Sequence, residues 1–402
     1  MVPLEPTPIE ESSGPLLFDP PVSGKFRWMG TSVLTFIPEK SFKYSTEYRV
    51  TIPAGIKSID GYILGTDYTW SFQTPRPKLI YHYPQNNAKW IKLNSLIFLR
   101  FNQPLDIGKA KDYIHFVEIS PKGEESELSF ELNHPSAEEL KDESVKARPE
   151  EVIVLKPLRK MKPGHSYHVE IIKGLPGKEG TLGMLKTYKF RFSTFGEFKF
   201  YGLENNHIKP DEPIHLYFTN PVNYMELIKK IRFQPEVKIP DYYFNWDYSA
   251  VKPWIYARFK PDTDYLLIIQ SDLRDEFNNE LGKEVKISFS TGSYKPSVNM
   301  KTGIGIIEAY GDLRFPVSVL NTKRAEIDIA ILNSDEVIPL LTNRKVFWRD
   351  EKYTGKKGFF DIYQNLIFDF PKNRRKIYAI ELDKILKGNH GFLFLQLDTH
   401  SE

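Results

Sequence analysis

The chain contains Lys260-Pro261-Asp262-Thr263-Asp264-Tyr265, and Phe289-Ser290-Thr291 follows this tyrosine after 24 residues. The same signature, a tyrosine after a turn and then a Phe-x-Thr triplet, occurs twice more. The other copies are Tyr48 with Phe72-Gln73-Thr74 and Tyr167 with Phe192-Ser193-Thr194, in which the tyrosine and phenylalanine are 24 and 25 residues apart. A spacing that is kept in three segments indicates repeated structural units. The chain is therefore expected to be an array of similar modules.

Two further patterns support the repeat. Lys162-Pro163-Gly164-His165-Ser166-Tyr167 matches the turn quoted above, and a Phe-x-x-Pro-aliphatic-Asp/Asn element occurs at residues 101–106 and 218–223. In this element a strand ends, proline sets the turn, and the Asp or Asn side chain can bond the following backbone. The element is missing upstream of Tyr48. The first module is therefore expected to be incomplete at its N-terminus, with an opening strand that has diverged or has been removed.

Composition limits the fold and the function. A chain of 402 residues is long enough for three or four domains. Aromatic residues make up 14% of it and 29 residues are proline, which favours sandwiches of short strands with proline-marked connections. The formal net charge of +3 is too weak to indicate a nucleic-acid or membrane-surface partner. No apolar run approaches the roughly 18 residues that a membrane helix needs.

The chain has no cysteine. This excludes thiol catalysis, zinc–thiolate sites and disulfide bonds, but it leaves the cellular compartment open. Residues 1–14 contain no basic-then-apolar signal peptide, so any export signal would have been removed.

The repeats predict an all-β fold, a tandem array of immunoglobulin-like and macroglobulin-like β-sandwich modules. Tyr48, Val50 and Ile52 alternate with polar residues, as in a half-buried strand. The Phe-x-Thr triplets and the Pro75-Arg76-Pro77 linker mark the boundaries, because proline cannot donate to a sheet ladder. The predicted modules are an N-terminally incomplete first module at 1–75, a second at 76–195 with a charged insertion at 121–150, a third at 196–292 and a macroglobulin-like fourth at 293–402.

The fourth module lacks the Tyr and Phe-x-Thr signature, and its strands are predicted from alternation alone. Ile327, Ile329 and Ile331 are expected to face its core, with Glu326 and Asp328 facing solvent. Residues 383–387 are expected to form a helical turn. The charged insertion of the second module is expected to be solvated, with room for a short helix.

Candidates for chemistry are weak. His165 and His168 are three residues apart, but an exposed pair is favoured over a metal site. Two corresponding loops contain acidic residues, Asp60-Gly61 in one and Asp272 with Asp275-Glu276 in the other. Each could bind calcium or form a capped turn, and the capped turn is favoured. Gly303-Ile304-Gly305 lacks the third glycine of a nucleotide site. No Gly-x-Ser-x-Gly occurs, and Asp350-Glu351 is an ordinary loop pair. We predict no enzyme activity, no catalytic residue, no metal ligand and no cofactor.

The aromatic residues have two interpretations. Tyr48, Tyr167 and Tyr265 could stack on a ligand, but each begins a strand after a turn, which favours a tyrosine corner whose hydroxyl bonds nearby backbone. A denser cluster could form a carbohydrate or peptide surface, although core and strand packing is favoured. Its members are Tyr242, Tyr243, Phe244, Trp246, Tyr248, Trp254 and Tyr256.

The sequence also resembles a known family. Phe18-Asp19-Pro20-Pro21-Val22-Ser23-Gly24-Lys25-Phe26-Arg27-Trp28 and Leu34-Thr35-Phe36-Ile37-Pro38 resemble the N-terminal region of bacterial alpha-2-macroglobulins. In that region, bacterial immunoglobulin-like modules precede a macroglobulin domain. Phe315-Pro316-Val317-Ser318-Val319-Leu320-Asn321 and Gly391-Phe392-Leu393-Phe394-Leu395-Gln396-Leu397 are similar to strands of the latter.

The resemblance implies a large periplasmic protease trap, often lipid-anchored to the inner membrane. In such a trap a protease cuts a bait segment, and a Cys-x-Glu-Gln thioester captures it in many members. This chain has no Cys-x-Glu-Gln and no low-complexity bait, so no thioester residue is carried over. We expect a non-catalytic, monomeric N-terminal scaffold or spacer of a longer endopeptidase inhibitor that protects the cell envelope. Its target proteases and its anchor would lie outside this chain. The alternative is a surface adhesin or glycan-binding module array, with residues 242–256 as its site.

Overall fold

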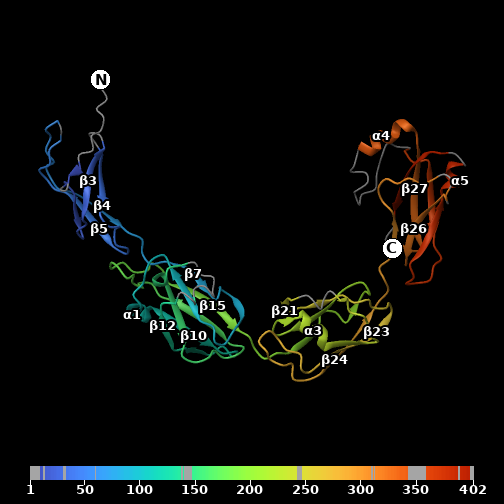
Figure 1. Ribbon diagram of the computed structural model, residues 1–402, viewed down its shortest axis with the longest axis horizontal. Helices are drawn as coiled ribbons and strands as arrows, with labels where there is room; N and C mark the ends of the chain where they lie inside the picture. Colours follow the sequence, from blue (N-terminus) through green and yellow to red (C-terminus); the bar gives the residue numbers. More distant parts are fainter. Residues whose placement is uncertain are drawn as a thin grey trace. The chain divides into compact units, whose positions relative to one another are not determined.

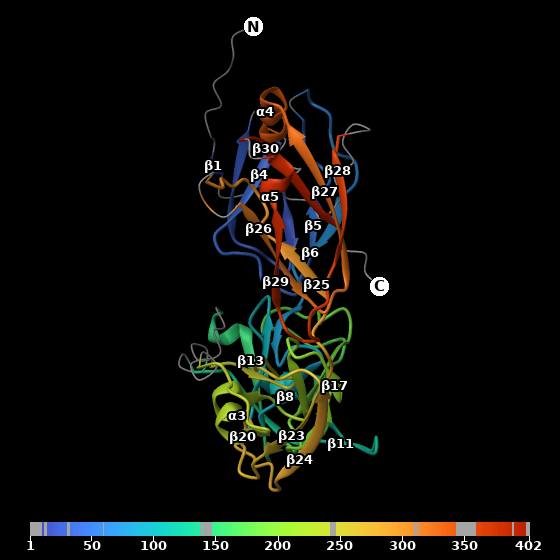
Figure 2. The same ribbon diagram turned by 90° about the vertical axis from the view of Figure 1, so that its right-hand side faces the viewer.

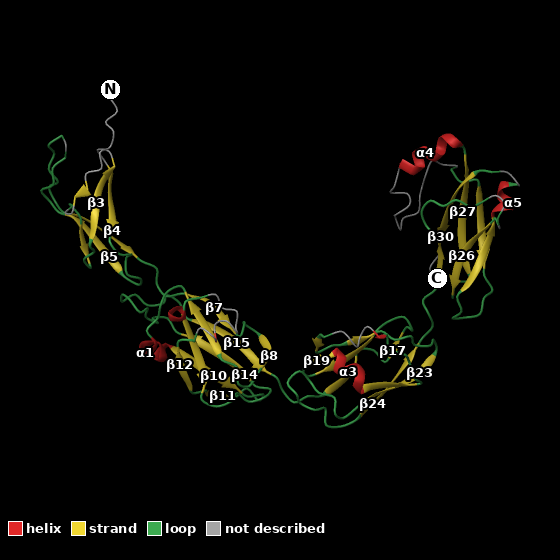
Figure 3. Cartoon of the chain, viewed as in Figure 1, coloured by secondary structure: helices red, strands yellow, loops and turns green. Residues whose placement is uncertain are grey.

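The computed structural model describes residues 10–11, 14–29, 33–58, 60–136, 139, 147–241, 247–308, 311, 313–342, 359–387 and 390–398. The chain is all-β, and short strands dominate every part of it (Figures 1 and 3). It divides into two compact units, Met1–Glu197 and Phe198–Glu402. The finer boundaries of the four modules stay a prediction, and the module names below refer to the predicted ranges.

The first module consists of two three-stranded sheets with the orders β1-β3-β4 and β2-β5-β6. Phe26, Tyr48 and Val50 are its buried apolar residues. Further aromatic rings pack around them, among them Phe36 and Phe42. The strands are β1 (Glu10–Glu11), β2 (Leu17–Asp19), β3 (Gly24–Met29), β4 (Val33–Pro38), β5 (Glu47–Ile52) and β6 (Tyr68–Gln73).

The second module is a larger sandwich whose sheets have the orders β11-β10-β14-β15-β8 and β12-β13-β9-β7. Its core includes Leu99, Phe116, Leu155, Val169 and Phe190. The strands are β7 (Leu79–Tyr83), β8 (Ala88–Ile91), β9 (Ile97–Phe101), β10 (Ile114–Ile119), β11 (Glu125–Glu127), β12 (Phe130–Asn133), β13 (Val152–Pro157), β14 (Ser166–Ile171) and β15 (Tyr188–Thr194). The helical turns are α1 (Ile107–Ala110), η1 (Lys111–Tyr113) and η2 (Pro149–Glu151).

The charged insertion of the second module is more ordered than the sequence predicts. Glu125–Glu127 pair with the edge of β10, so this acidic stretch is a solvated edge strand. Ser136 and Glu139 bond each other's backbone N–H groups, which is the capping box of a helix N-terminus. Residues 137–138 and 140–146, where the short helix is predicted, lie outside the described residues.

The third module has sheets of order β16-β18-β22 and β17-β24-β23-β20, with a two-stranded ribbon β19-β21. Its core includes Leu216, Phe218, Phe259, Leu267 and Phe289. The elements are β16 (Phe200–Leu203), β17 (His207–Ile208), β18 (Ile214–Phe218), β19 (Val222–Asn223), α3 (Tyr224–Lys230), β20 (Ile231–Gln234), β21 (Ser249–Ala250), β22 (Trp254–Ile255), β23 (Thr263–Ile269) and β24 (Val285–Thr291).

The fourth module packs sheet β25-β26-β29 on sheet β28-β27-β30, and α4 follows the end of β27 (Figure 2). The predicted helical turn is confirmed as α5. One prediction for β27 is wrong, because Asp328 is buried and Ile331 is exposed. Residues 327–330 are all buried, so both faces of β27 are covered near Asp328. The elements are β25 (Ser297–Met300), β26 (Arg314–Leu320), β27 (Arg324–Leu332), α4 (Ser334–Thr342), β28 (Ile362–Ile367), β29 (Lys376–Glu381), α5 (Leu382–Leu386) and β30 (Phe392–Asp398).

Candidate functional site at the module ends

The repeated tyrosines are corner residues. Each is buried, and each phenol oxygen accepts a hydrogen bond from the backbone N–H of the lysine five residues earlier. Burial raises the pKa of Tyr167 to about 12, so this phenol stays neutral at ordinary pH. The donor–acceptor pairs are Lys43 to Tyr48 at 3.1 Å, Lys162 to Tyr167 at 2.7 Å and Lys260 to Tyr265 at 2.8 Å. The prediction of tyrosine corners is therefore confirmed.

The threonine of each Phe-x-Thr triplet holds the same turn from the other side. Its hydroxyl donates to the carbonyl of the corner lysine, at 2.7 Å for Thr74 to Lys43, 2.7 Å for Thr194 to Lys162 and 2.6 Å for Thr291 to Lys260. One backbone residue is thus bonded through its N–H to the tyrosine and through its C=O to the threonine. The two conserved spacings of the signature arise because both side chains must reach this one residue.

The phenylalanine of the triplet completes the packing. It lies opposite the tyrosine in the strand register, and the two rings stack with centroids 5.4, 5.6 and 5.3 Å apart in the three modules. The residue before each corner lysine joins this stack or its core. It is Phe42, Met161 or Phe259, and the two phenylalanines contact the stacked rings edge-on. Sequence reasoning missed this position, because two residue types occupy it.

A fourth feature ties each turn to the linker that leaves the module. The residue three before the tyrosine is Ser45, Gly164 or Asp262, and each has a left-handed backbone with φ of 55°, 70° and 48°. Glycine, serine and aspartate are residues that turns accept. The N–H of this residue donates to the carbonyl of the residue after the threonine, which is Pro75 at 3.1 Å, Phe195 at 2.8 Å and Gly292 at 3.1 Å. We call these three N–H to C=O contacts the exit bonds.

Ser45 of the first module also forms hydrogen bonds with the second module. Its buried hydroxyl donates to Oε1 of Gln103 at 2.9 Å, and Nε2 of Gln103 donates to the carbonyl of Pro75 at 3.0 Å. The carbonyl of Ser45 accepts the N–H groups of Thr181 and Leu182 at 2.9 and 2.8 Å. Ser45 and Gln103 are both fully buried, and the side-chain polar groups of both are hydrogen-bonded. The two modules are therefore joined by a buried polar contact.

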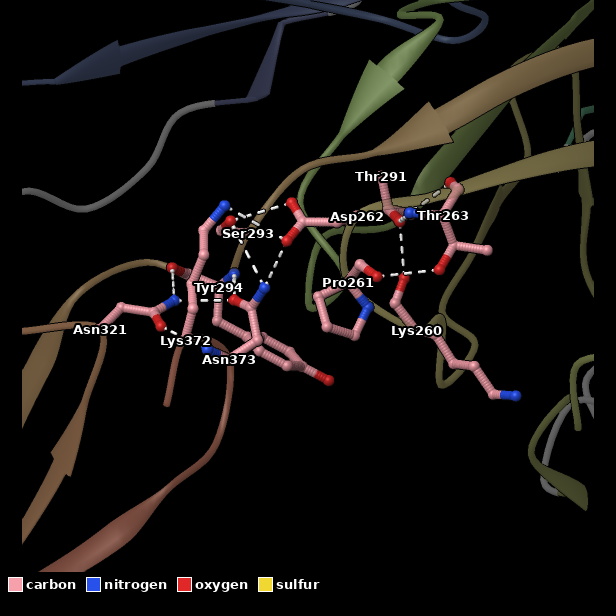
Figure 4. Close-up of polar contacts among 10 residues, drawn as sticks. All are labelled: Lys260, Pro261, Asp262, Thr263, Thr291, Ser293, Tyr294, Asn321, Lys372 and Asn373. Atoms are coloured by element: carbon pink, nitrogen blue, oxygen red, sulfur yellow. Dashed lines mark hydrogen bonds and ion pairs between the residues drawn. The ribbon is translucent and has the colours of Figure 1, made fainter. Parts of the chain in front are cut away.

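The corresponding joint after the third module uses different residues (Figure 4). Asp262 accepts hydrogen bonds from Ser293 at 2.9 Å and from Nδ2 of Asn373 at 2.6 Å, and Lys372 lies 3.3 Å from its carboxylate. These groups, the hydrogen bond from Ser293 first, hold the pKa of Asp262 below its usual value. Asn373 Oδ1 also accepts from the N–H of Tyr294 at 3.0 Å and from Nδ2 of Asn321 at 2.8 Å. The turn is thereby linked to two loops of the fourth module.

The Phe-x-x-Pro elements have the predicted role. Asp106 accepts from the N–H of Gly108 at 3.0 Å and caps α1, and Asn223 accepts from that of Met225 at 2.9 Å and caps α3. The aliphatic residues beside them, Leu105 and Val222, are buried.

The prediction of an exposed histidine pair is wrong. His168 is buried on β14, the central strand of five, and burial lowers its pKa. His165 Nδ1 lies 2.8 Å from the buried carboxylate of Glu118, which also pairs with Lys162 and Arg159. Burial is the largest influence on Glu118 and raises its pKa, but the hydrogen bonds from Lys162 and Arg159 outweigh it and the net pKa is lowered. The cluster joins the corner turn of the second module to β10.

Of the two loops weighed as calcium sites, the one at residues 272–276 is a capped turn at Asp275. The carboxylate of Asp275 accepts from the N–H groups of Phe277 and Asn279 at 2.9 and 2.8 Å. It also accepts from the side-chain amides of Asn220 and Asn279 at 2.7 and 2.9 Å. Asp272 instead pairs with Lys230 at 2.5 Å. Among the described residues, no group of three or more His, Asp and Glu side chains could hold a metal ion.

Only part of the predicted aromatic cluster lies within the described residues. Tyr242, Tyr243, Phe244 and Trp246 lie outside the described residues. Trp254 contacts Tyr224 edge-on, and its backbone N–H donates to the Tyr224 hydroxyl at 2.8 Å, so it takes part in packing around a buried residue. Tyr248 and Tyr256 are exposed. A hollow of about 640 Å³ borders Tyr265 and Phe289, but both rings are buried in the corner stack and present no face to a ligand.

We expect Tyr265→Phe to lower the free energy of unfolding of the third module by about 0.5–1.5 kcal/mol, because one hydrogen bond is lost while the ring stack is kept. Urea unfolding of the wild type and the variant would measure the difference. Tyr201→Phe, at an exposed position of the same module, is the matched control and should have little effect. A variant of unchanged stability would contradict the structural role.

With this geometry established, comparisons with known proteins place the chain. The family model described as bacterial Ig-like domain matches residues 16–74 and 75–194. The Alpha-2-macroglobulin homolog of Nostoc sp. is 21% identical over 371 residues, which cover 84% of this chain and 19% of that protein. The chain is thus similar to an alpha-2-macroglobulin homolog over most of its own length. It is also 24% identical over 356 residues to Circularly permutated Ras protein 2 of Dictyostelium discoideum, covering 83% of this chain and 9% of that protein.

Solved structures similar to the chain include bacterial alpha-2-macroglobulins. A crystal structure of the native Escherichia coli protein spanning domains MG0-NIE-MG1 has 14% identity and a TM-score of 0.27, over 51% of this chain and 67% of that one. A cryo-EM reconstruction of its native conformation has 12% identity and a TM-score of 0.22, over 75% and 19%. The chain spans about a fifth of the length of the alpha-2-macroglobulin homolog and less than a tenth of the length of the second curated relative.

The resemblance recognised in the sequence is thus confirmed, and the all-β array of immunoglobulin-like modules with it. Among the described residues, no helix is both long and apolar enough to cross a membrane.

Proposed function

We propose that the chain is the non-catalytic N-terminal scaffold of an alpha-2-macroglobulin-like protease trap, an endopeptidase inhibitor that protects the cell envelope. The proposal rests on one observation. In three modules the signature tyrosine and threonine are bonded to the module's own turn, a residue of that turn is bonded to the outgoing linker, and at two joints the same turn contacts the next module. Side chains used in this way position modules and do not bind substrate.

We also propose a cellular location and binding partners for the longer parent protein. Its target proteases would meet residues outside this chain, and a lipid anchor outside this chain would attach the parent to the inner membrane on the periplasmic side. The scaffold would then separate the trap from the membrane and contribute to its outer shell. The name of the Nostoc relative supports the trap, and the location is inferred from the family resemblance.

We expect the 402-residue chain alone to leave protease activity unchanged. Trypsin would be assayed on casein and on a small peptide substrate, with the chain at equimolar and tenfold excess. The full-length parent should reduce cleavage of casein while sparing the small peptide, because a caged protease excludes large substrates only. Stoichiometric inhibition by the chain alone would contradict a scaffold role. The adhesin alternative would be favoured if the parent slows cleavage of neither substrate but binds glycan-coated beads, and if Tyr248→Ala abolishes that binding.

A further inference from the structure

Positive charge is concentrated at one end of the fourth module. The chain as a whole is nearly balanced, with 55 basic and 52 acidic residues, yet Lys372, Arg374, Arg375 and Lys376 occupy four of the five positions 372–376. All four residues are exposed. They lie in the loop from β28 to β29 and at the start of β29. A local excess of cations in a balanced chain marks a place to which anions are attracted.

A second loop brings more cations to the same end. The turn from β26 to β27 contains Lys323 and is followed by Arg324, and both are exposed. Arg324 lies opposite Ile367 at the end of β28, and the N–H of Phe368 donates to the carbonyl of Lys323 at 2.9 Å, so the two loops are neighbours. We call the cations of both loops the cation cluster. Its members are Lys323, Arg324, Lys372, Arg374, Arg375 and Lys376.

A pair of asparagines locks the two loops together. Asn321 and Asn373 both have a left-handed backbone, with φ of 53° and 63°. The N–H of Asn373 donates to Oδ1 of Asn321 at 2.6 Å, and Nδ2 of Asn321 donates to Oδ1 of Asn373 at 2.8 Å (Figure 4). The backbone that carries the cations is therefore fixed, and the loops need not be ordered when a ligand binds.

Most of these cations are not neutralised by the part of the chain that the structure describes. Nζ of Lys372 lies 3.3 Å from Oδ2 of Asp262, and Nη1 of Arg375 donates to the neutral hydroxyl of Ser318 at 3.0 Å. The other four members of the cluster form no ion pair with the described residues, although Asp369 is exposed in the same loop. The cluster therefore keeps most of its charge available to an outside anion.

We propose that the cation cluster is a binding site for closely spaced phosphate groups. A phosphate monoester carries about two negative charges and presents three acceptor oxygens, so a few such groups neutralise a compact set of cations. The guanidinium groups of Arg374 and Arg375 suit phosphate, which they bind through two parallel hydrogen bonds. Carboxylates of a polypeptide carry one charge each and match this density less well. The site goes beyond the scaffold role and does not depend on it.

Two neighbouring side chains distinguish the two sources of such phosphates, a lipid headgroup and a soluble polyphosphate. Ile367 and Ile377 flank the cation cluster in sequence and are 74% and 63% exposed. A lipid surface would bury apolar side chains beside its headgroups, whereas a soluble polyphosphate would leave them in water. Ile377→Ser should therefore weaken binding to a lipid surface and leave binding of a soluble polyphosphate unchanged.

The test uses the 402-residue chain and two probes. Inorganic tripolyphosphate is titrated by calorimetry, and vesicles of phosphatidylcholine with and without phosphatidylglycerol are tested by sedimentation. Saturable binding that weakens as sodium chloride is raised is expected. Binding to vesicles only when phosphatidylglycerol is present, weakened by Ile377→Ser, assigns the phosphates to lipid headgroups. Binding of tripolyphosphate without vesicle binding assigns them to a soluble ligand, and binding of neither probe would overturn the proposal.

Two double variants of the chain locate the site. Arg374→Gln with Arg375→Gln should weaken binding about tenfold or more, because charge-assisted contacts are lost. Lys323→Gln with Lys376→Gln should act in the same direction, and it leaves the contact of Arg375 with Ser318 intact if the first variant does not fold. Wild-type affinity in a folded variant of either kind would overturn the proposal.

The control removes the same charge elsewhere. Arg27→Gln with Arg49→Gln changes two exposed residues of the first module and should leave binding unchanged. Equal weakening by this control and by the loop variants would overturn the proposal, because it would show a response to net charge alone. Tighter binding of a poly-glutamate peptide than of tripolyphosphate would overturn it in favour of an acidic polypeptide.

Asn321→Gly separates the fixed loops from their charges. It removes the amide that bonds Asn373 and keeps every cation, and glycine accepts the left-handed backbone. Binding should weaken severalfold, since the ligand must then order the loops. Unchanged binding by the folded variant would overturn a site built on fixed loops.

Discussion

Replacing Phe259 by alanine should lower the free energy of unfolding of the third module by about 3–5 kcal/mol. The ring is 2% exposed and lies edge-on to three others, with centroids 5.3 Å from Phe233, 5.2 Å from Tyr265 and 5.4 Å from Phe289. Its removal leaves a cavity between the corner stack and β20, and the corner lysine that follows it loses its support. Urea unfolding monitored by near-UV circular dichroism would measure the loss.

The second module supplies a matched control for this change. Met161 occupies the same position before a corner lysine there and is also buried. Phe259→Met should therefore cost less than about 1.5 kcal/mol, because methionine fills most of the volume and is already compatible with this turn. Equal losses for the alanine and methionine variants would show that the ring, and not the filling of space, stabilises the corner. A negligible loss for alanine would contradict the packing described here.

Replacing Asp275 by alanine should lower the free energy of unfolding of the third module by about 2–4 kcal/mol. Four donors, two of them backbone N–H groups, lose their acceptor at a residue that is 5% exposed. The loop between β23 and β24 should then exchange its amide protons faster. Hydrogen exchange and urea unfolding would measure the two effects.

Asp272 provides the control for this second change. It lies in the same loop, but its side chain is 56% exposed and pairs with a lysine at the surface, so Asp272→Ala should cost no more than about 1 kcal/mol. Added calcium should not alter the melting temperature of the wild type, because the Asp275 oxygens are already used by protein donors. A calcium-dependent rise that Asp275→Ala abolishes would show that the loop is a metal site.

The sequence predicted those positions of the tyrosine corner at which only one residue type can make the required hydrogen bond. Tyrosine reaches a backbone N–H from a strand start, and threonine reaches a carbonyl from a strand end, so both recur at fixed spacing. The Asp106 and Asn223 caps were predictable for the same reason, since only a short polar side chain after the turn can accept from the next backbone amides.

Other features could not be predicted because several residue types satisfy the same need. The left-handed position accepts Ser45, Gly164 or Asp262, and the position before the lysine accepts phenylalanine or methionine. The joint partners Gln103 and Asn373 are far away in the chain, and no local pattern marks them. Burial of Asp328 and His168 was missed because successive residues of their strands are buried there on both faces, so alternation does not identify an open face.

The exit bonds have a mechanical consequence. Tension applied through a linker does not reach the last strand of the module alone, because the first linker carbonyl is bonded to the corner turn, which precedes the tyrosine strand. The load is divided between two neighbouring strands, and stretching must shear their shared ladder instead of opening it one bond at a time. A module built in this way resists being pulled apart from its C-terminal end.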